Sequence, residues 1–163
     1  MTETKPSIVV GCLRVAMGSI FLWAFVDKLF GLGFATTKEH AWLLGGSPTA
    51  GFLTFGTHGP FAHYFQLLAG KAVVDWLFMM GLCLLGLALV LGIGMRMTAL
   101  SGSVLLGLMW LAALPPKNNP LVDEHVVYIL VLWVLYATHA GRVFGVGAWW
   151  SKTRLVQRYS FLE

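Results

Sequence analysis

The chain has 163 residues, of which 58% are hydrophobic and 11% are charged, whereas an ordinary soluble domain has roughly 45–50% apolar and about 25% charged residues. This composition excludes a water-soluble globular protein and predicts an integral membrane protein in contact with lipid. The formal net charge of +4 is modest, and the basic residues are dispersed or lie at the C-terminus, so nucleic acid is not an expected partner. Apolar stretches recur along the whole length, which predicts a single transmembrane domain over residues 1–163.

Four stretches are long and apolar enough to cross a membrane, which takes roughly 20 residues in a helix. They cover residues 8–32, 73–95, 97–114 and 124–143. The first is too long for a signal-peptide core and lacks a cleavage pattern, so we expect it to be retained. A tight turn around Arg96 joins the second and third, and Asp123 can cap the fourth. The sequence therefore predicts an all-α, integral membrane four-helix bundle.

Residues 33–72 are too apolar for a solvated linker and too interrupted by Gly and Pro for another span. The segments SPTAGFLTF and GPFAHYFQLL each carry Pro near a helix start, which predicts two short helices in a cap over one mouth of the bundle. Cytoplasmic loops carry an excess of Lys and Arg. With both termini cytoplasmic, that side holds seven of the 11 basic residues, and the other side holds Lys28, Lys38, Lys71 and Lys117. We therefore expect a multi-pass protein of the cell membrane with both termini in the cytoplasm and the cap outside.

Ionisable side chains gather at this extracytoplasmic mouth. Asp27 and Lys28 lie near the outer end of the first span, where charged residues are costly and usually face the bundle interior. Trp23 shares a helical face with Asp27 because the two are spaced i, i+4. Two interpretations stay open: a neighbour satisfies Asp27 while Lys28 extends to the surface, or Asp27 belongs to a functional site.

The second span repeats the pattern with Lys71 and Asp75, also spaced i, i+4. The two side chains could simply pair on one helix face. Asp75 is nevertheless the only ionisable residue within that span, so its partner could equally be a cation from another helix or a polar ligand.

The fourth span opens with Asp123, Glu124 and His125. The two carboxylates suit the positive end of a helix dipole without any further chemistry. His125 is not explained in this way, and Tyr128 follows it at i+3 on the same face. Imidazole exchanges protons near neutral pH, so His125 is either a polar interface residue or part of a site.

Metal and thiol chemistry have little support in the sequence. Cys12 and Cys83 lie in different predicted spans at different depths, which disfavours a disulfide. His58 and His63 lack a recognised metal-ligand spacing. We therefore predict no metal site.

Several motifs together resemble the DoxX-like superfamily. They are RVAMGSIFLWAFVDK in the first span, GLALVLGIGMRMTAL across the turn, and NPLVDEHVVY at the start of the fourth span. More narrowly, AWLLGGSPTAGFL, GPFAHYF and NPLVDEH resemble the DoxD type, the membrane subunit of thiosulfate:quinone oxidoreductase. The resemblance implies a subunit that oxidises thiosulfate to tetrathionate with a membrane quinone as acceptor, usually beside a small DoxA-like partner.

The residues present allow such a reaction to be written. Thiosulfate or a related sulfur anion would approach the outer mouth near three lysines, Lys28, Lys71 and Lys117. A quinone would be held against Trp23 and Tyr128. His125, with Asp75 or Asp27, would supply protons to the quinol oxygens.

Two other functions remain alternatives. A non-catalytic membrane anchor or assembly subunit fits the lack of a recognised redox centre in the chain, and a small transporter of anions or sulfur compounds would require internal repeats or interrupted spans that the sequence does not show. Small residues would let the helices approach closely, and would permit a homo-oligomer whose order the sequence does not specify. These are Gly11, Gly18, Gly81, Gly86, Gly102 and Gly107.

Overall fold

The computed structural model describes residues 7–116, 119–159 and 161. Helices make up 70% of the structure, and none of the described residues forms a strand. The four longest helices are α1 (Ile8–Phe30), α3 (Ala72–Leu91), α4 (Met95–Ala112) and α5 (Glu124–Ala137). The short elements are η1 (Lys38–His40), η2 (Trp42–Leu44), the π-helical turn η3 (Phe52–Gly56), α2 (Ala62–Gln66), η4 (Ala140–Arg142), α6 (Gly147–Trp150) and α7 (Arg154–Arg158).

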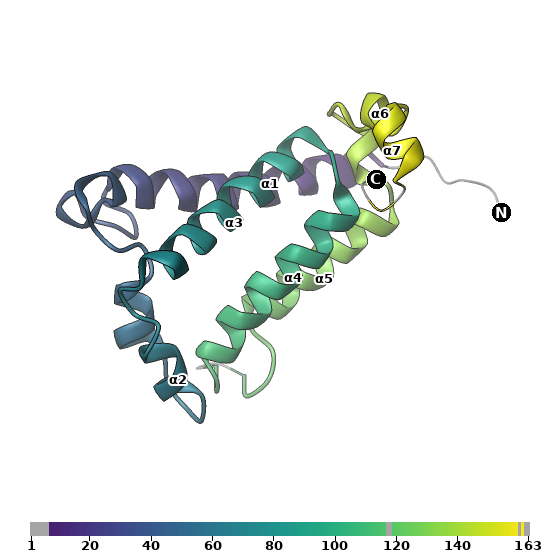
Figure 1. Cartoon of the computed structure of the whole chain (residues 1–163). Helices are drawn as coiled ribbons and strands as arrows, with labels where there is room; N and C mark the ends of the chain where they lie inside the picture. Colours follow the sequence, from purple (N-terminus) through teal and green to yellow (C-terminus); the bar gives the residue numbers. More distant parts are fainter. Residues whose placement is uncertain (1–6, 117–118, 160, 162–163) are drawn as a thin grey trace.

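The long helices form two antiparallel pairs, α1 with α3 and α4 with α5. The pairs meet at the turn between α3 and α4 and diverge away from it, and the cap lies at the open ends of the pairs (Figure 1). The turn is tight because Gly92 and Gly94 take up left-handed backbone angles, with φ of 76° and 57°. Arg96 therefore lies in the first turn of α4, and not in the connection as expected from the sequence.

Glycines bring the helices of each pair close together, as the sequence predicted for some of them. A Cβ atom at Gly86 would lie 2.6 Å from the side chain of Leu22 across the α1–α3 contact. A Cβ atom at Gly102 would lie 2.5 Å from Leu132 across the α4–α5 contact. At Gly107, in contrast, nothing lies within 4 Å, so the predicted close approach is wrong there.

Three helices are long and apolar enough to cross a membrane: α1 with 23 residues, α3 with 20 and α4 with 18. The predicted fourth span over residues 124–143 is too long, because α5 ends at Ala137 and His139 turns into the left-handed region with φ 51°. At 1.5 Å per residue, its 14 residues span roughly 21 Å, less than the hydrocarbon core of about 30 Å. The four-helix arrangement is present, but only three of its helices have spanning length.

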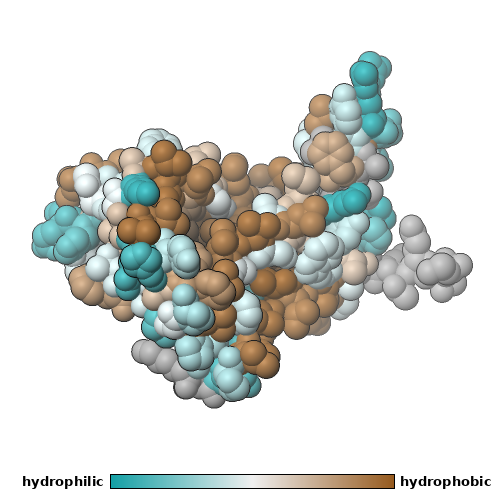
Figure 2. Space-filling model, turned by 60° about the horizontal axis from the view of Figure 1, so that its bottom comes forward, coloured by the Kyte–Doolittle hydropathy of each residue, from teal (hydrophilic) through white to brown (hydrophobic). Residues whose placement is uncertain are grey.

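The buried core lies between the helices and consists of apolar side chains: Met17, Phe21, Leu82, Leu85, Leu89, Met95, Ala99, Leu106, Leu132, Leu135 and Ala140. Many large apolar side chains point outward instead, including Trp76, Leu77 and Val104, which are 59%, 71% and 64% exposed. Figure 2 shows such hydrophobic residues spread over one face of the molecule. A surface of this kind is unfavourable in water and suits contact with lipid.

Arg14 is fully buried and joins α1 to two distant segments. Its guanidinium donates hydrogen bonds to the carbonyl of Leu89 and, at 3.0 Å, to that of Val90 at the end of α3. It also donates to the carbonyls of Val143 at 2.6 Å and Phe144 at 3.0 Å in the segment after η4. Arg14 is thus part of the interior, where it ties α1 to the end of α3 and to the segment after η4.

Candidate functional site

The charged residues divide the molecule into two ends. In the part of the chain that the structure describes, the acidic residues all lie at the ends of the helix pairs away from the α3–α4 turn, here called the acidic end: Asp27, Glu39, Asp75, Asp123 and Glu124. The opposite, basic end carries Arg14, Arg96, Arg142, Lys152, Arg154 and Arg158. The candidate site residues predicted from the sequence that the structure describes belong to the acidic end.

Asp27 holds the loop that follows α1. Its carboxylate accepts hydrogen bonds from the backbone N–H groups of Phe34 at 3.2 Å and Ala35 at 3.0 Å, and the residue is only 1% exposed. Gly31 ends α1 in the left-handed conformation and turns the chain back toward this carboxylate. The geometry supports the interpretation in which neighbouring groups satisfy Asp27, while its catalytic role remains a prediction.

Asp75 holds the cap onto α3. One carboxylate oxygen accepts hydrogen bonds from the Ser47 hydroxyl at 2.9 Å, the Thr49 hydroxyl at 2.6 Å and the Thr49 backbone N–H at 3.1 Å. No ion pair among the described residues joins Asp75 to Lys71, which is exposed at the N-cap of α3. Asp75 is therefore satisfied by two polar residues of the cap, and the expected pair on the helix face does not form.

Asp123 and His125 form a hydrogen-bonded pair at the start of α5. One oxygen of the Asp123 carboxylate lies 2.7 Å from Nδ1 of His125. Its other oxygen accepts from the backbone N–H groups of His125 at 3.0 Å and Val126 at 3.3 Å, which confirms the predicted N-cap. One carboxylate thus caps the helix and orients the imidazole.

The protonation of this pair follows from its hydrogen bonds. Burial on its own raises the pKa of the Asp123 carboxyl, but hydrogen bonds from the His125 ring and from the backbone N–H groups of Val126 and His125 outweigh it and lower the pKa below its usual value. The carboxylate is therefore ionised at neutral pH and can only accept hydrogen bonds, so Nδ1 of His125 carries a proton. The Nε2 atom is the ring nitrogen that Asp123 does not contact.

The surroundings of the pair are partly open. The side chains of His125 and Asp123 are 13% and 10% exposed. Tyr128, one turn along α5, is half-buried against the core. Asp123, Glu124 and His125 each place one possible ligand atom within 4.8 Å of the others, a donor set that hard or borderline divalent cations use. Nδ1 of His125 already makes a hydrogen bond to Asp123, so these groups are arranged as a hydrogen-bonded pair and not primarily as metal ligands.

The predicted site residues on α1 belong to a different element from His125. Figure 1 places the outer end of α1 and the start of α5 at different corners of the acidic end. Trp23 on α1 is 49% exposed, and its ring packs edge-on against Phe34 at 5.1 Å. Lys28 is half-buried beside Asp27. The predicted substrate ligand Lys117 lies outside the described residues.

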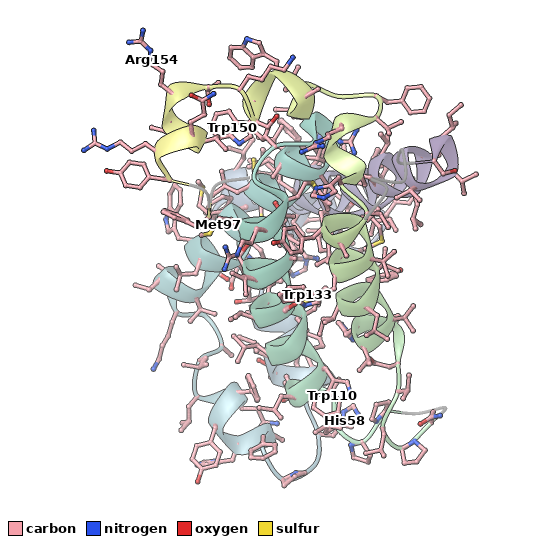
Figure 3. All side chains as sticks on the ribbon, turned by 90° about the vertical axis from the view of Figure 1, so that its right-hand side faces the viewer. His58, Met97, Trp110, Trp133, Trp150 and Arg154 are labelled. Atoms are coloured by element: carbon pink, nitrogen blue, oxygen red, sulfur yellow. The ribbon has the colours of Figure 1, made fainter. Side chains whose placement is uncertain are left out.

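The cap also reaches the far helix pair. The backbone N–H of His58 donates to the carbonyl of Ala112 at the end of α4 at 3.3 Å. Nearby, the indole of Trp110 donates to the carbonyl of Leu121 at 3.0 Å in the loop before α5 (Figure 3). The first bond ties the cap to α4, and the second holds the loop that leads into Asp123 and His125.

Sequence reasoning missed Ser47 and Thr49 as partners of Asp75, and it read the Asp123 carboxylate only as a helix cap. The partners of Asp75 lie 26 and 28 residues away and have no local signal. The Asp123–His125 contact could have been found, because an acceptor at the N-cap lies close to a side chain two residues later.

Comparisons with protein-family models, with curated proteins and with solved structures find no match for this chain. The proposal that follows therefore rests on the residues and their geometry.

Proposed function

We propose that the chain is the membrane subunit of a quinone-linked oxidoreductase of the DoxD type, within the DoxX-like superfamily. It would oxidise thiosulfate or a related sulfur anion at the acidic end and pass the electrons to a membrane quinone. The observation that carries the proposal is the Asp123–His125 pair, because it fixes a proton-exchanging imidazole at the boundary between polar loops and an apolar helix.

The chemistry needs such a group. Oxidation of two thiosulfate anions to tetrathionate releases two electrons, and a quinone that accepts them also takes up two protons. An imidazole held in one tautomer by a carboxylate delivers protons in a defined direction, here through Nε2 of His125. Tyr128 lies one turn further along the same helix face and offers a hydroxyl to a quinol oxygen.

The remaining predicted residues take supporting roles in this proposal. Lys28 and Lys71 contribute positive charge at the acidic end, which partly offsets the charge of the carboxylates toward an approaching dianion. Asp27 and Asp75 hold the loops of the cap in place, and in this proposal His125 is the first proton donor. His125 and Asp123 are then the residues whose loss should abolish turnover while leaving the cap intact.

The test is quinone reduction by the protein purified in mild detergent, on addition of thiosulfate, with and without any co-purifying chain. General acid–base catalysis contributes about 10²- to 10⁴-fold, so His125→Gln should lower the rate by roughly a hundredfold or more. Asp123→Asn should also slow the reaction, because its amide can donate to Nδ1 and reverse the tautomer. The matched control is His63→Gln, an exposed histidine in the cap. Equal rates for the two histidine variants would refute the assignment.

A non-catalytic assembly subunit is the second candidate. It is favoured by the purely structural bonds of Asp27 and Asp75, which account for two of the three predicted catalytic residues without any reaction. In that case the purified protein should contain no quinone and should not be stabilised by added quinone. Deletion of the chain would instead reduce the amount of an associated oxidoreductase in the membrane.

A further inference from the structure

The cap at the open ends of the helix pairs exposes large apolar side chains on three of its short elements (Figure 1). Leu43 and Leu44 lie on η2, Phe55 on η3 and Tyr64 on α2, and all four are more than half exposed. The exposed fraction of Phe55 reaches 87%. Exposed apolar residues gathered in this way mark a surface that contacts a partner or a membrane.

The same part of the cap carries no charged side chain. Residues 45–70 contain no Asp, Glu, Lys or Arg. The charged residues around this stretch are exposed, with Lys38 and Glu39 on η1 and Lys71 at the N-cap of α3. The rim of a protein–protein interface is polar and accessible to solvent, whereas contact with lipid chains disfavours charge. The composition of this surface therefore favours lipid over a protein as its partner.

Two polar side chains of this stretch are buried while its large apolar side chains are exposed. Thr49 and Thr57 are only 5% and 6% exposed. The Thr49 hydroxyl donates to the Asp75 carboxylate at 2.6 Å, and the Thr57 hydroxyl donates to the carbonyl of Leu53 at 2.8 Å. Water favours the opposite arrangement, because burial of apolar side chains stabilises a fold and burial of polar groups costs free energy. The arrangement of the cap suits apolar surroundings.

The exposed surface of the cap continues into the apolar outer faces of two long helices. The rings of Trp42 in η2 and Trp76 in α3 pack edge-on with their centroids 4.7 Å apart. Val73 is the second residue of α3 and is 71% exposed, so the apolar face of this helix extends to the cap. Phe34, in the loop after α1, is also exposed and packs against Trp23 of α1. A bilayer that covers the outer faces of α1 and α3 therefore also reaches the cap.

The backbone of the cap determines the depth at which it contacts lipid. Its helical elements have only three to five residues and are joined by irregular segments. Irregular backbone exposed to lipid does not occur in the hydrocarbon core, because its N–H and C=O groups would lack partners. Thr54, His63 and Gln66 are exposed polar residues that also require water or headgroups. Apolar side chains on such a backbone are accommodated at the boundary between headgroups and acyl chains, about 5–10 Å deep.

We propose that the cap is an interfacial membrane anchor. Its elements η2, η3 and α2 lie at the headgroup level of the leaflet at the acidic end, and the charged turn η1 extends into water. The lipid it contacts is a zwitterionic phospholipid, because residues 45–70 offer no Lys or Arg to an anionic headgroup. The inference is independent of the oxidoreductase proposal, since it concerns only the exposed surface of the cap.

The test is site-directed fluorescence quenching of the full chain in phosphatidylcholine vesicles. The variants Cys12→Ala and Cys83→Ala remove the native thiols, and a single cysteine at Phe55→Cys or Tyr64→Cys carries a bimane label. Lys38→Cys is the matched control, because Lys38 is an exposed residue on η1 of the same cap. Iodide on both sides of the membrane reports contact with water. Phosphatidylcholine brominated near the headgroup or near the chain ends reports contact with lipid and its depth.

Bromine near the headgroup should quench labels at positions 55 and 64 several-fold more strongly than iodide or chain-end bromine does, and iodide should dominate at position 38. Strong quenching by iodide at positions 55 and 64 would overturn the proposal, because the cap would then lie in water. Weak quenching by every reagent would also overturn it, because another protein or a second copy would then cover the surface. Dominant quenching by chain-end bromine, or equal lipid quenching at positions 38 and 55, would contradict the interfacial placement. If Phe55→Cys does not fold, position 64 decides in the same way.

Discussion

Replacing Asp75 by alanine should release the cap from α3 without unfolding the helix pairs. The carboxylate accepts three hydrogen bonds, two of them from Thr49 and one from Ser47, and the residue is 5% exposed. Its loss leaves the buried hydroxyl and N–H group of Thr49 without an acceptor. This perturbation distinguishes a carboxylate that positions the cap from one that takes part in a reaction.

The magnitude follows from these contacts. A hydrogen bond to a charged group contributes about 1.5–3 kcal/mol, and a buried donor left without a partner costs about 1–3 kcal/mol. Because the three bonds share one acceptor, we expect the local opening free energy of the cap to fall by about 3–5 kcal/mol in Asp75→Ala, less than their sum. Asp75→Asn keeps one carbonyl acceptor and should cost about 1–2 kcal/mol.

Amide hydrogen exchange of the cap is the appropriate assay, because it reports local opening rather than global unfolding. Asp75→Ala should speed exchange at Thr49 and its neighbours by roughly a hundredfold or more, since about 1.4 kcal/mol corresponds to tenfold. Glu39→Ala is the matched control, because Glu39 is an exposed carboxylate in the same cap. Unchanged exchange in Asp75→Ala would refute the anchoring role.

Three further predictions concern packing, pH and the buried cation. Gly86→Ala should destabilise the α1–α3 pair by about 1–3 kcal/mol in thermal unfolding, because the added Cβ would lie 2.9 Å from the backbone of α1. Gly107→Ala is the control: its added Cβ has open space, so the variant should stabilise the protein by about 0.5–1 kcal/mol. Equal effects of the two substitutions would contradict the packing described here for Gly86. The lowered pKa of Asp123 means that its stabilisation of the start of α5 is complete above its unfolded-state value of about 3.9 and is lost as pH falls through the lower folded value. The protection of the first amides of α5 against hydrogen exchange, relative to their intrinsic exchange rates, should therefore fall only in acid, and Asp123→Asn should remove that dependence on pH. Arg14→Met should lower the free energy of unfolding by about 2–4 kcal/mol, because four backbone carbonyls lose their hydrogen-bond donor. An unchanged unfolding temperature would show that these carbonyls find other partners.

The helical class, the positions of the long helices and the cap of α5 could be predicted from the sequence. Asp123 lies directly before an apolar run, and its capping bonds reach only two and three residues ahead. The end of α5 could not be predicted in this way, because the apolar pattern continues past Ala137 to Val143. The chain leaves the helix at His139, where the packing of η4 against α1 and α5 favours a turn.

The candidate site was predictable as a set of residues but not as an arrangement. Asp27, Asp75 and His125 stand out because each is an ionisable group beside or within an apolar stretch. Nothing in the sequence says that the first two are satisfied by the cap or that the outer end of α1 lies apart from the start of α5. The pairing of His125 with Asp75 or Asp27 in proton transfer therefore stays a prediction.

The sequence by itself determined that this protein is suited to a membrane and where its long helices begin. These properties follow from the transfer of apolar side chains and from bonds between near neighbours, which are local quantities. Only the tertiary structure decided the roles of Arg14 and Asp75. Their hydrogen-bond partners lie 129 and 28 residues away, for Val143 and Ser47 respectively. Such partners are set by how the helices pack, because a buried polar group binds whatever donor or acceptor the fold brings to it.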